Sequence, residues 1–406
     1  MTEDTLLAPG TGGVHTDVFA HRLRQARLAA GLSLDQLARR LRRPLTKQAL
    51  SKFEAGKAKP AMTTLADLSE ALGVGGAWLM SQPEVRVSWI GYRKHSTLLK
   101  GRQDSITALA TKRIEGELRL RTLFGAGIDC AVPTGIEVES LEVAEDAARH
   151  VRAAWGLGDS PISGLVETLE AQGTVVLAWP ETEKFDGLSG WANEGTPVVV
   201  VNAIRPPDRI RFDAAHELGH LVIDSADPEA DQEALAHRFA AALLVPRSAA
   251  IQELGERRRD LSLPELGLLK QRWGLSMQAW ARRAYDCGII GQTAYRDINV
   301  KFRMRGWHRH EPYDYEGVEE PILFRRLLWR ALEEGIVSRH EARELLPGYD
   351  LTPEATLGDA EFSLSELARL GPEQQAEAVR RRPPEVDLTE LAEWEAGTAI
   401  DVDVDR

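Results

Sequence analysis

The sequence has few cysteines, no long apolar run and no basic leader. Its only cysteines are Cys130 and Cys287, which lie far apart in the chain. Two such residues cannot build a disulfide framework or a cysteine-based zinc site, and their scarcity fits a reducing compartment. No apolar run reaches the roughly 20 residues of a membrane span, and the first residues are acidic. We therefore expect a cytoplasmic protein without a signal peptide or a transmembrane helix.

The net charge of −12 disfavours nucleic-acid binding by the chain as a whole, but the charge is unevenly distributed. Between residues 22 and 59 only Asp35 and Glu54 are acidic. The basic residues of this segment are Arg22, Arg24, Arg27, Arg39, Arg40, Arg42, Arg43, Lys47, Lys52, Lys57 and Lys59. A basic module on an acidic protein indicates a phosphate-binding surface, although a solvated basic face without a partner would have the same composition.

Short helices separated by turns are predicted in this basic segment. One apolar helical pattern ends at Gly31, and Ser33 begins the next helix with Gln36 at the capping-box position. A third helix is predicted over residues 46–54 and a fourth over residues 62–72. Four or five short helices joined in this way favour a helix-turn-helix domain.

The stretch from 19 to 80, which includes "LSKFEAGKAKP" and "LADLSEALGVGGAWLM", resembles the XRE family of lambda-repressor-like DNA-binding domains. In that family the helix matching residues 46–54 enters the major groove, where lysine can donate to guanine and glutamine can pair with adenine. Contacts to phosphates position such a domain without specifying sequence. The resemblance thus assigns base edges to Lys47, Gln48 and Lys52, the start of the helix to Thr46, and phosphates to Arg42, Arg43, Lys57 and Lys59.

The same resemblance implies a structural ion pair within the domain and double-stranded DNA as its partner. Arg27 and Glu54 match a family ion pair between the first and third helices. Relatives bind palindromic double-stranded DNA as dimers, so a homodimer is possible here. A helical domain that binds protein instead of DNA is the alternative.

Strand-like runs and helices alternate irregularly in the middle of the chain. A connecting helix is predicted near residues 104–124, and β-branched runs follow at 174–179, 187–193 and 196–203. The run at 196–203 can hold an extended substrate as an added strand. A helix is then predicted from Pro206 and Pro207 toward Ile223, so the domain is α+β with a small sheet.

The motif "RFDAAHELGHLVID" lies in this helix. His216 and His220 are four residues apart and share one face, which suits two nitrogen ligands of one zinc ion. Glu217 lies near that face and can accept a proton from a water molecule, as in the HExxH zinc peptidases. A buried, hydrogen-bonded histidine pair is the alternative.

A catalytic zinc ion needs a third protein ligand. Asp224 is about 12 Å along the helix axis from His216, which favours a position in the second coordination shell or a cap. Glu233 and His237 lie one turn apart on the next predicted helix and are the other candidates.

"FDAAHELGHLVID" followed by "EALAHRFAAALLVP", with "SGWANEGTPVVVVNA" before it, resembles the ImmA/IrrE metallopeptidase family. The resemblance implies that Glu233 completes a site for Zn²⁺ or another divalent metal. The family usually has asparagine where this chain has His237, so His237 is a second possible ligand or a polar group beside the cleft.

The family also implies a zinc-dependent endopeptidase that cleaves an XRE-type repressor, or the chain itself, to control gene expression. The alternative is a non-catalytic transcription factor or antitoxin in which the same fold is a sensor or a binding module.

The expected fold is therefore multidomain. It combines an all-α helix-turn-helix domain, a central α+β zincin-like metallopeptidase domain with a small sheet, and a helical C-terminal region. The expected boundaries are a disordered tail at 1–16, the DNA-binding domain at 17–81, a helical linker at 82–130, the metallopeptidase domain with a trailing helix-turn-helix-like unit at 131–295, a C-terminal helical domain at 296–384 and an acidic tail at 385–406.

Overall fold

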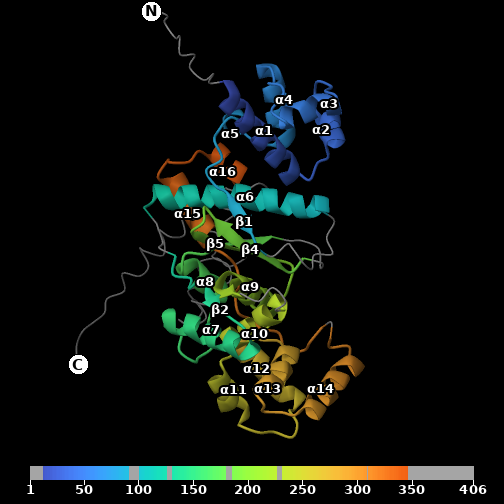
Figure 1. The fold of residues 1–406 in the computed structure, drawn as a ribbon, viewed down its shortest axis with the longest axis vertical. Coiled ribbons are helices and arrows are strands. Elements are labelled where there is room, and N and C mark those ends of the chain that lie inside the picture. Colours follow the sequence, from blue (N-terminus) through green and yellow to red (C-terminus); the bar gives the residue numbers. More distant parts are fainter. Residues whose placement is uncertain are drawn as a thin grey trace, which may run out of the picture. The chain divides into compact units, whose positions relative to one another are not determined.

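The computed structural model describes residues 12–90, 100–125, 130–179, 185–225, 231–308 and 310–345 (Figure 1). The chain divides into two compact units, Met1–Ala331 and Leu332–Arg406. In the second unit, Ser338 Oγ accepts a hydrogen bond from the Glu341 N–H (3.2 Å) at the start of α16 (Arg339–Leu345). The acidic tail predicted at 385–406 lies outside the described residues. No helix of the described part is long and apolar enough to cross a bilayer.

Five helices form the amino-terminal domain: α1 (Gly12–Ala29), α2 (Leu34–Arg40), α3 (Lys47–Glu54), α4 (Met62–Leu72) and α5 (Gly76–Leu79). The Ser33–Gln36 capping box is present, which confirms the predicted start of α2. Leu23, Leu37, Leu50 and Leu68 are completely buried between these helices. Each such side chain contributes about 1.5–3 kcal/mol through the hydrophobic effect, which explains why so small a domain can fold.

The predicted ion pair between α1 and α3 is also present. Arg27 Nε lies 2.6 Å from Glu54 Oε1, and Arg27 Nη2 lies 2.9 Å from Glu54 Oε2. This bidentate pair fixes the position of α3, the predicted recognition helix, against α1.

A mixed four-stranded sheet forms the centre of the chain, with strand order β1-β4-β5-β3. The strands are β1 (Val87–Trp89), β3 (Val175–Trp179), β4 (Gly187–Ala192) and β5 (Thr196–Asn202). β5 pairs with β3 on one side and β4 on the other. Both edges of the run predicted at 196–203 are thus occupied, and the expectation that it binds substrate as an added strand is wrong.

Helices cover both faces of this sheet (Figure 1). Val198 and Val200 of β5 belong to a core shared with α6 (Lys100–Leu123). Val199 and Val201 belong to the core on the opposite face. A run of four valines buried on both faces is what a strand between two helical layers requires.

The helix layer on the second face carries the predicted metal ligands. It contains α7 (Leu141–Ala154), α8 (Leu165–Ala171), α9 (Pro207–Val222) and α10 (Gln232–Leu244). α9 packs against β4 and β5, and α10 packs between α9 and α7. A small parallel pair, β2 (Ile136–Glu137) and β6 (Ile223–Asp224), lies where α9 ends. The helices that follow are α11 (Arg247–Leu254), α12 (Leu263–Trp273), α13 (Met277–Asp286), α14 (Gln292–Met304) and α15 (Leu323–Glu333).

Candidate metal centre

α9 places the two motif histidines on one face. Pro207 stands in its first turn, where proline's missing N–H removes no helical hydrogen bond. His216 and His220 follow one turn apart, and their Nε2 atoms are 3.1 Å from each other. Two ring nitrogens so close together need a shared proton or a shared cation between them.

α10 adds an acidic group to this pair. Asp231 caps the helix by accepting a hydrogen bond from the Ala234 N–H (3.1 Å), and Glu233 lies in the first turn. Its carboxylate oxygens are 3.2 Å from His216 Nε2 and 3.6 Å from His220 Nε2.

The close approach of α9 and α10 depends on Gly219. A Cβ atom at this position would lie 3.1 Å from Phe239 Cδ1 and 3.2 Å from the backbone Cα of Ala236. The glycine of the motif therefore lets α10 come near enough for Glu233 to reach the histidines.

Gly219→Val is expected to destabilise the domain and to weaken metal binding together. The added methyl groups must push α10 away, and overpacking of this kind costs about 1–3 kcal/mol. Urea unfolding and a zinc competition titration measure the two effects. Gly101→Val is the matched control, because Gly101 is also helical and an added Cβ there meets no atom within 4 Å. Loss of stability without loss of zinc affinity would contradict this role for Gly219.

The distances among the three donors fit a tetrahedral cation. Zinc bonds to nitrogen and carboxylate oxygen are about 2.0–2.2 Å long, so neighbouring ligand atoms lie roughly 3.3 Å apart. The observed separations are close to that spacing: 3.1 Å between the two Nε2 atoms, 3.2 Å from His216 Nε2 to Glu233 Oε2 and 3.6 Å from His220 Nε2 to Glu233 Oε1. Two imidazoles and one carboxylate are also the donor types of a catalytic zinc site.

The protonation of these groups also suits a cation. Burial and then His216 lower the pKa of His220 to about 4, and the hydrogen bond to His216 lowers the pKa of Glu233 to about 2. At neutral pH His220 is thus neutral and Glu233 ionised. Burial alone would lower the pKa of His216, but the hydrogen bond to Glu233 and the nearby carboxylates raise it. A divalent cation and the proton on His216 therefore compete for the same donors.

Glu217 is buried beside this cluster, with only 6% of its surface exposed. Burial is the main cause that raises its pKa to about 7. One carboxylate oxygen, Oε2, has no hydrogen-bond partner among the described residues. A carboxylate with a pKa near neutrality and an uncommitted oxygen can accept a proton from water and return it.

Strand β4 holds the Glu217 side chain in place, which the sequence reasoning missed. A Cβ at Gly187 would lie 2.7 Å from Glu217 Oε1, and the Ser189 hydroxyl faces the same carboxylate. The glycine in "GLSGWAN" is the available signal, because glycine within a strand often marks the close approach of another group.

His237 and Asp224, the two other candidate residues of the metal site, lie in different places. His237 forms a second candidate donor group with His216 and Glu233: one ligand atom of each lies within 4.8 Å of the others. Its ring stacks on Phe212 with centroids 5.7 Å apart. Asp224 lies in β6, where its carbonyl accepts a hydrogen bond from Val138 N–H (2.9 Å), and it is not in the cluster.

The predicted DNA contacts gather around α3. Thr46 caps the helix by accepting a hydrogen bond from the Ala49 N–H (3.1 Å). The side chains of Lys47, Gln48, Lys52 and Lys57 are exposed.

Three of the predicted cations have acidic partners that the sequence reasoning did not identify. Lys47 Nζ lies 2.7 Å from Asp35 Oδ2, Arg43 Nε lies 3.7 Å from Asp67 Oδ2, and Arg42 pairs with Glu70. Exposed pairs of this kind contribute about 0–1 kcal/mol, so phosphates can replace the carboxylates at little cost.

Two family models match the chain. The helix-turn-helix model matches residues 23–79, and the model of the IrrE N-terminal-like domain, a peptidase family, matches residues 169–285. The second range contains β3, β4, β5, α9 and α10. A comparison with curated proteins gives no match.

Proposed function

Because the chain joins an XRE-type helix-turn-helix domain to an IrrE N-terminal-like peptidase domain, we propose that it is a cytoplasmic, DNA-binding transcription regulator with zinc-dependent endopeptidase activity. The proposed substrate is a repressor-type protein or the chain itself. The observation that carries the proposal is the set of donor separations of 3.1, 3.2 and 3.6 Å among His216, His220 and Glu233.

In this proposal His216, His220 and Glu233 hold the cation. His237 lies beside them as a further polar group, and Asp224 supports the end of α9. When bound, zinc supplies Lewis acidity, which lowers the pKa of water and polarises a carbonyl oxygen.

Glu217 is the proposed general base. Its buried carboxylate takes a proton from the attacking water and passes it to the leaving nitrogen of the peptide. Gly187 and Ser189 hold the carboxylate in one orientation, so that the same oxygen can receive and return the proton.

The amino-terminal domain is proposed to bring this activity to DNA. Lys47, Gln48 and Lys52 are assigned to base edges, and Arg42, Arg43 and Lys57 to phosphates, with Thr46 at the start of the recognition helix. Protein substrates bound at the same promoter would then be presented at high local concentration.

Lys52→Gln is expected to weaken binding to the selected operator by about 1–3 kcal/mol, because a base-edge donor is lost. Affinity is measured by fluorescence anisotropy at one fixed salt concentration, after operator selection with the wild-type chain. Arg149→Gln is the control, since Arg149 is an exposed basic residue of α7, outside the helix-turn-helix domain. An equal loss in both variants would show that only overall charge matters.

The peptidase activity is tested by comparing new protein amino termini in cells that express the wild-type chain and cells that do not. The expected result is a discrete cleavage product from a DNA-binding repressor, or from this chain. Purified substrate and metal-loaded chain should then reproduce that cleavage, and failure to do so would refute a direct peptidase role.

A further inference from the structure

The segment between the two domains forms part of the catalytic-domain sheet. Its strand β1 pairs antiparallel with β4, with Val87 opposite Ala192, Ser88 opposite Trp191 and Trp89 opposite Gly190. The pairing continues at both ends, where Ile90 N–H donates to Ser189 O (2.9 Å) and Asn193 N–H donates to Arg86 O (2.8 Å). What the sequence indicated as a helical linker thus begins as the edge strand of the sheet.

This edge of β4 passes directly beside the proposed general base. Gly187 and Ser189 face Glu217, and Ser189 O also accepts the hydrogen bond from β1. Alternate residues of a strand present their backbone groups to the same edge, so Gly187 presents its N–H and C=O on the side where β1 lies. Among the described residues, β1 covers this edge only from Ser189 to Asn193.

An extended peptide that adds to this edge would overlap with β1. Strand addition supplies a row of main-chain hydrogen bonds and suits extended segments of proteins. A peptide that reaches past Gly187 on both sides needs the backbone groups of Ser189 and Trp191, and these already bind β1. β1 therefore occupies backbone groups of β4 that an added peptide would also need.

Specific contacts hold β1 at this edge. A Cβ atom on Gly190 would lie 2.5 Å from Ser88 O, so the glycine permits the close pairing. The Asn193 side chain accepts a hydrogen bond from Arg86 N–H (3.0 Å) and donates one to Glu84 O (3.1 Å).

The connector is also bound to the DNA-binding domain. The fully buried Arg22 of α1 donates to Ser81 O (3.1 Å) and Gln82 O (2.8 Å) and pairs with Glu115 of α6 (2.5 Å). Glu115 in turn accepts a hydrogen bond from Glu84 N–H (2.9 Å). Arg22 and Glu115 therefore tie the connector to both α1 and α6.

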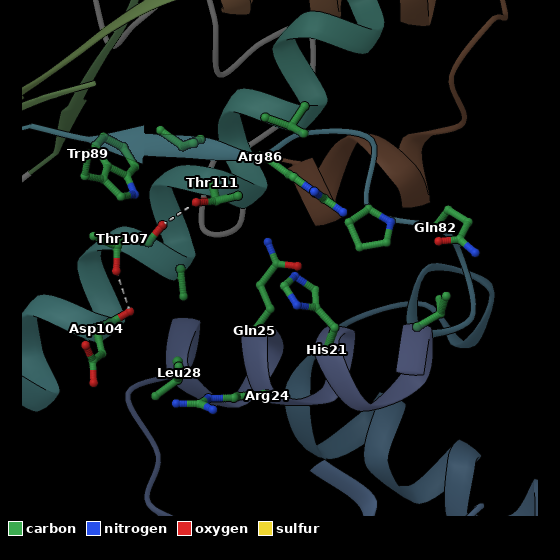
Figure 2. A pocket seen from close by; sticks show the side chains of 15 residues that line it. His21, Arg24, Gln25, Leu28, Gln82, Arg86, Trp89, Asp104, Thr107 and Thr111 are labelled. Atoms are coloured by element: carbon green, nitrogen blue, oxygen red, sulfur yellow. Dashed lines mark hydrogen bonds between the residues drawn. The ribbon is translucent and has the colours of Figure 1, made fainter. Parts of the chain in front are cut away.

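β1 is nevertheless short, and there is room beside it. A cavity of about 810 Å³ lies between α1, the connector and α6, lined by His21, Gln25, Arg86, Trp89 and Thr107 among others (Figure 2). His21 and Gln25 extend into it from α1, and no residue of β4 lines it. Val87 and Trp89 of β1 are only partly buried against the core beneath α6, so a three-residue strand with open space beside it can leave the edge for the loss of a few contacts.

We propose that the outer edge of β4 is a binding surface for an extended peptide strand, and that β1 occupies it as an intramolecular competitor. The proposal rests on the proposed peptidase function, for which it names the regulation: substrates gain access when the connector leaves the edge.

A labelled peptide tests the surface directly. The probe is a fluorescein-labelled peptide of residues 84–90, "EVRVSWI", and all chains carry Glu217→Gln so that nothing is hydrolysed. Ser88→Pro removes an N–H that faces β4 and should release β1. We expect the Ser88→Pro chain to bind the peptide at least about tenfold more tightly than the Glu217→Gln parent, a difference of about 1.4 kcal/mol. Ser88→Ala, which keeps the backbone donor, should bind like the parent.

Adding Gly190→Ala to the Ser88→Pro chain should abolish the gain, because the added Cβ would clash with a strand that pairs as β1 does, and the probe has the sequence of β1. Asn193→Gly is a second way to weaken β1 if Ser88→Pro impairs folding. Equal peptide binding in all variants, or binding insensitive to Gly190→Ala, would overturn the proposal. If the peptide binds as expected but a Ser88→Pro chain with Glu217 intact cuts no peptide, the peptidase function fails while the binding surface stands.

Discussion

Glu217→Gln is expected to reduce hydrolysis of the protein substrate by about 10²–10⁴-fold while metal and DNA binding stay close to wild type. Glutamine has nearly the same shape but cannot accept a proton at neutral pH. The three donors around the cation are left untouched, and the helix-turn-helix domain lies outside the altered region. The rates are measured on the purified substrate under single-turnover conditions.

Gly187→Ala is the companion to this variant. It leaves Glu217 in the chain but forces its carboxylate away from β4, so a partial loss of hydrolysis with full metal content is expected. Undiminished cleavage by Glu217→Gln would remove Glu217 from the mechanism. If gene regulation persists in this variant and no substrate of the wild type is found, the non-catalytic regulator is the better description.

Glu319→Ala is expected to lower the free energy of unfolding by about 3–5 kcal/mol, because it leaves a buried cation without its partner. Arg211 of α9 and the Glu319 carboxylate are both fully buried, 2.5 Å apart. Glu319 also accepts hydrogen bonds from Leu165 N–H (3.2 Å) and Val166 N–H (2.9 Å) at the start of α8. One carboxylate therefore joins a late segment of the chain to two helices of the catalytic layer.

Urea denaturation measures this loss, with Glu320→Ala as the matched control. Glu320 is the next residue in the chain, and its pair with Arg325 (3.5 Å) is exposed on both sides, so a change of less than about 1 kcal/mol is expected. Similar effects of the two substitutions would mean that Arg211 finds other partners and that the buried pair does not hold α9.

Much of the site could be predicted because it depends on local spacing. His216, Glu217 and His220 are ordered by a single helical turn. The helix that follows offered both Glu233 and His237, and the family resemblance favoured Glu233. The same reasoning found the helix-turn-helix domain, since caps at Ser33 and Thr46 act within their own helices.

Features that depend on distant partners could not be predicted. Strand β1 looks like part of a linker, because nothing in residues 87–89 reveals that Gly190 leaves room for them. A valine-rich strand has the same sequence pattern at the edge of a sheet and in its interior. The sequence of 196–203 therefore could not show that β3 and β4 occupy both of its edges. Glu319 is one acidic residue among several, and only the fold brings it to Arg211.

A cobalt(II) titration tests most directly whether α9 and α10 jointly hold one divalent cation. The prediction is one Co²⁺ per chain with the visible absorption of a tetrahedral site, lost in His216→Ala and in Glu233→Ala and retained in His237→Asn. An absorption that survives His216→Ala, or that disappears in His237→Asn but not in Glu233→Ala, would contradict the ligand set. A wild-type chain that binds no Co²⁺ would contradict the metal centre altogether.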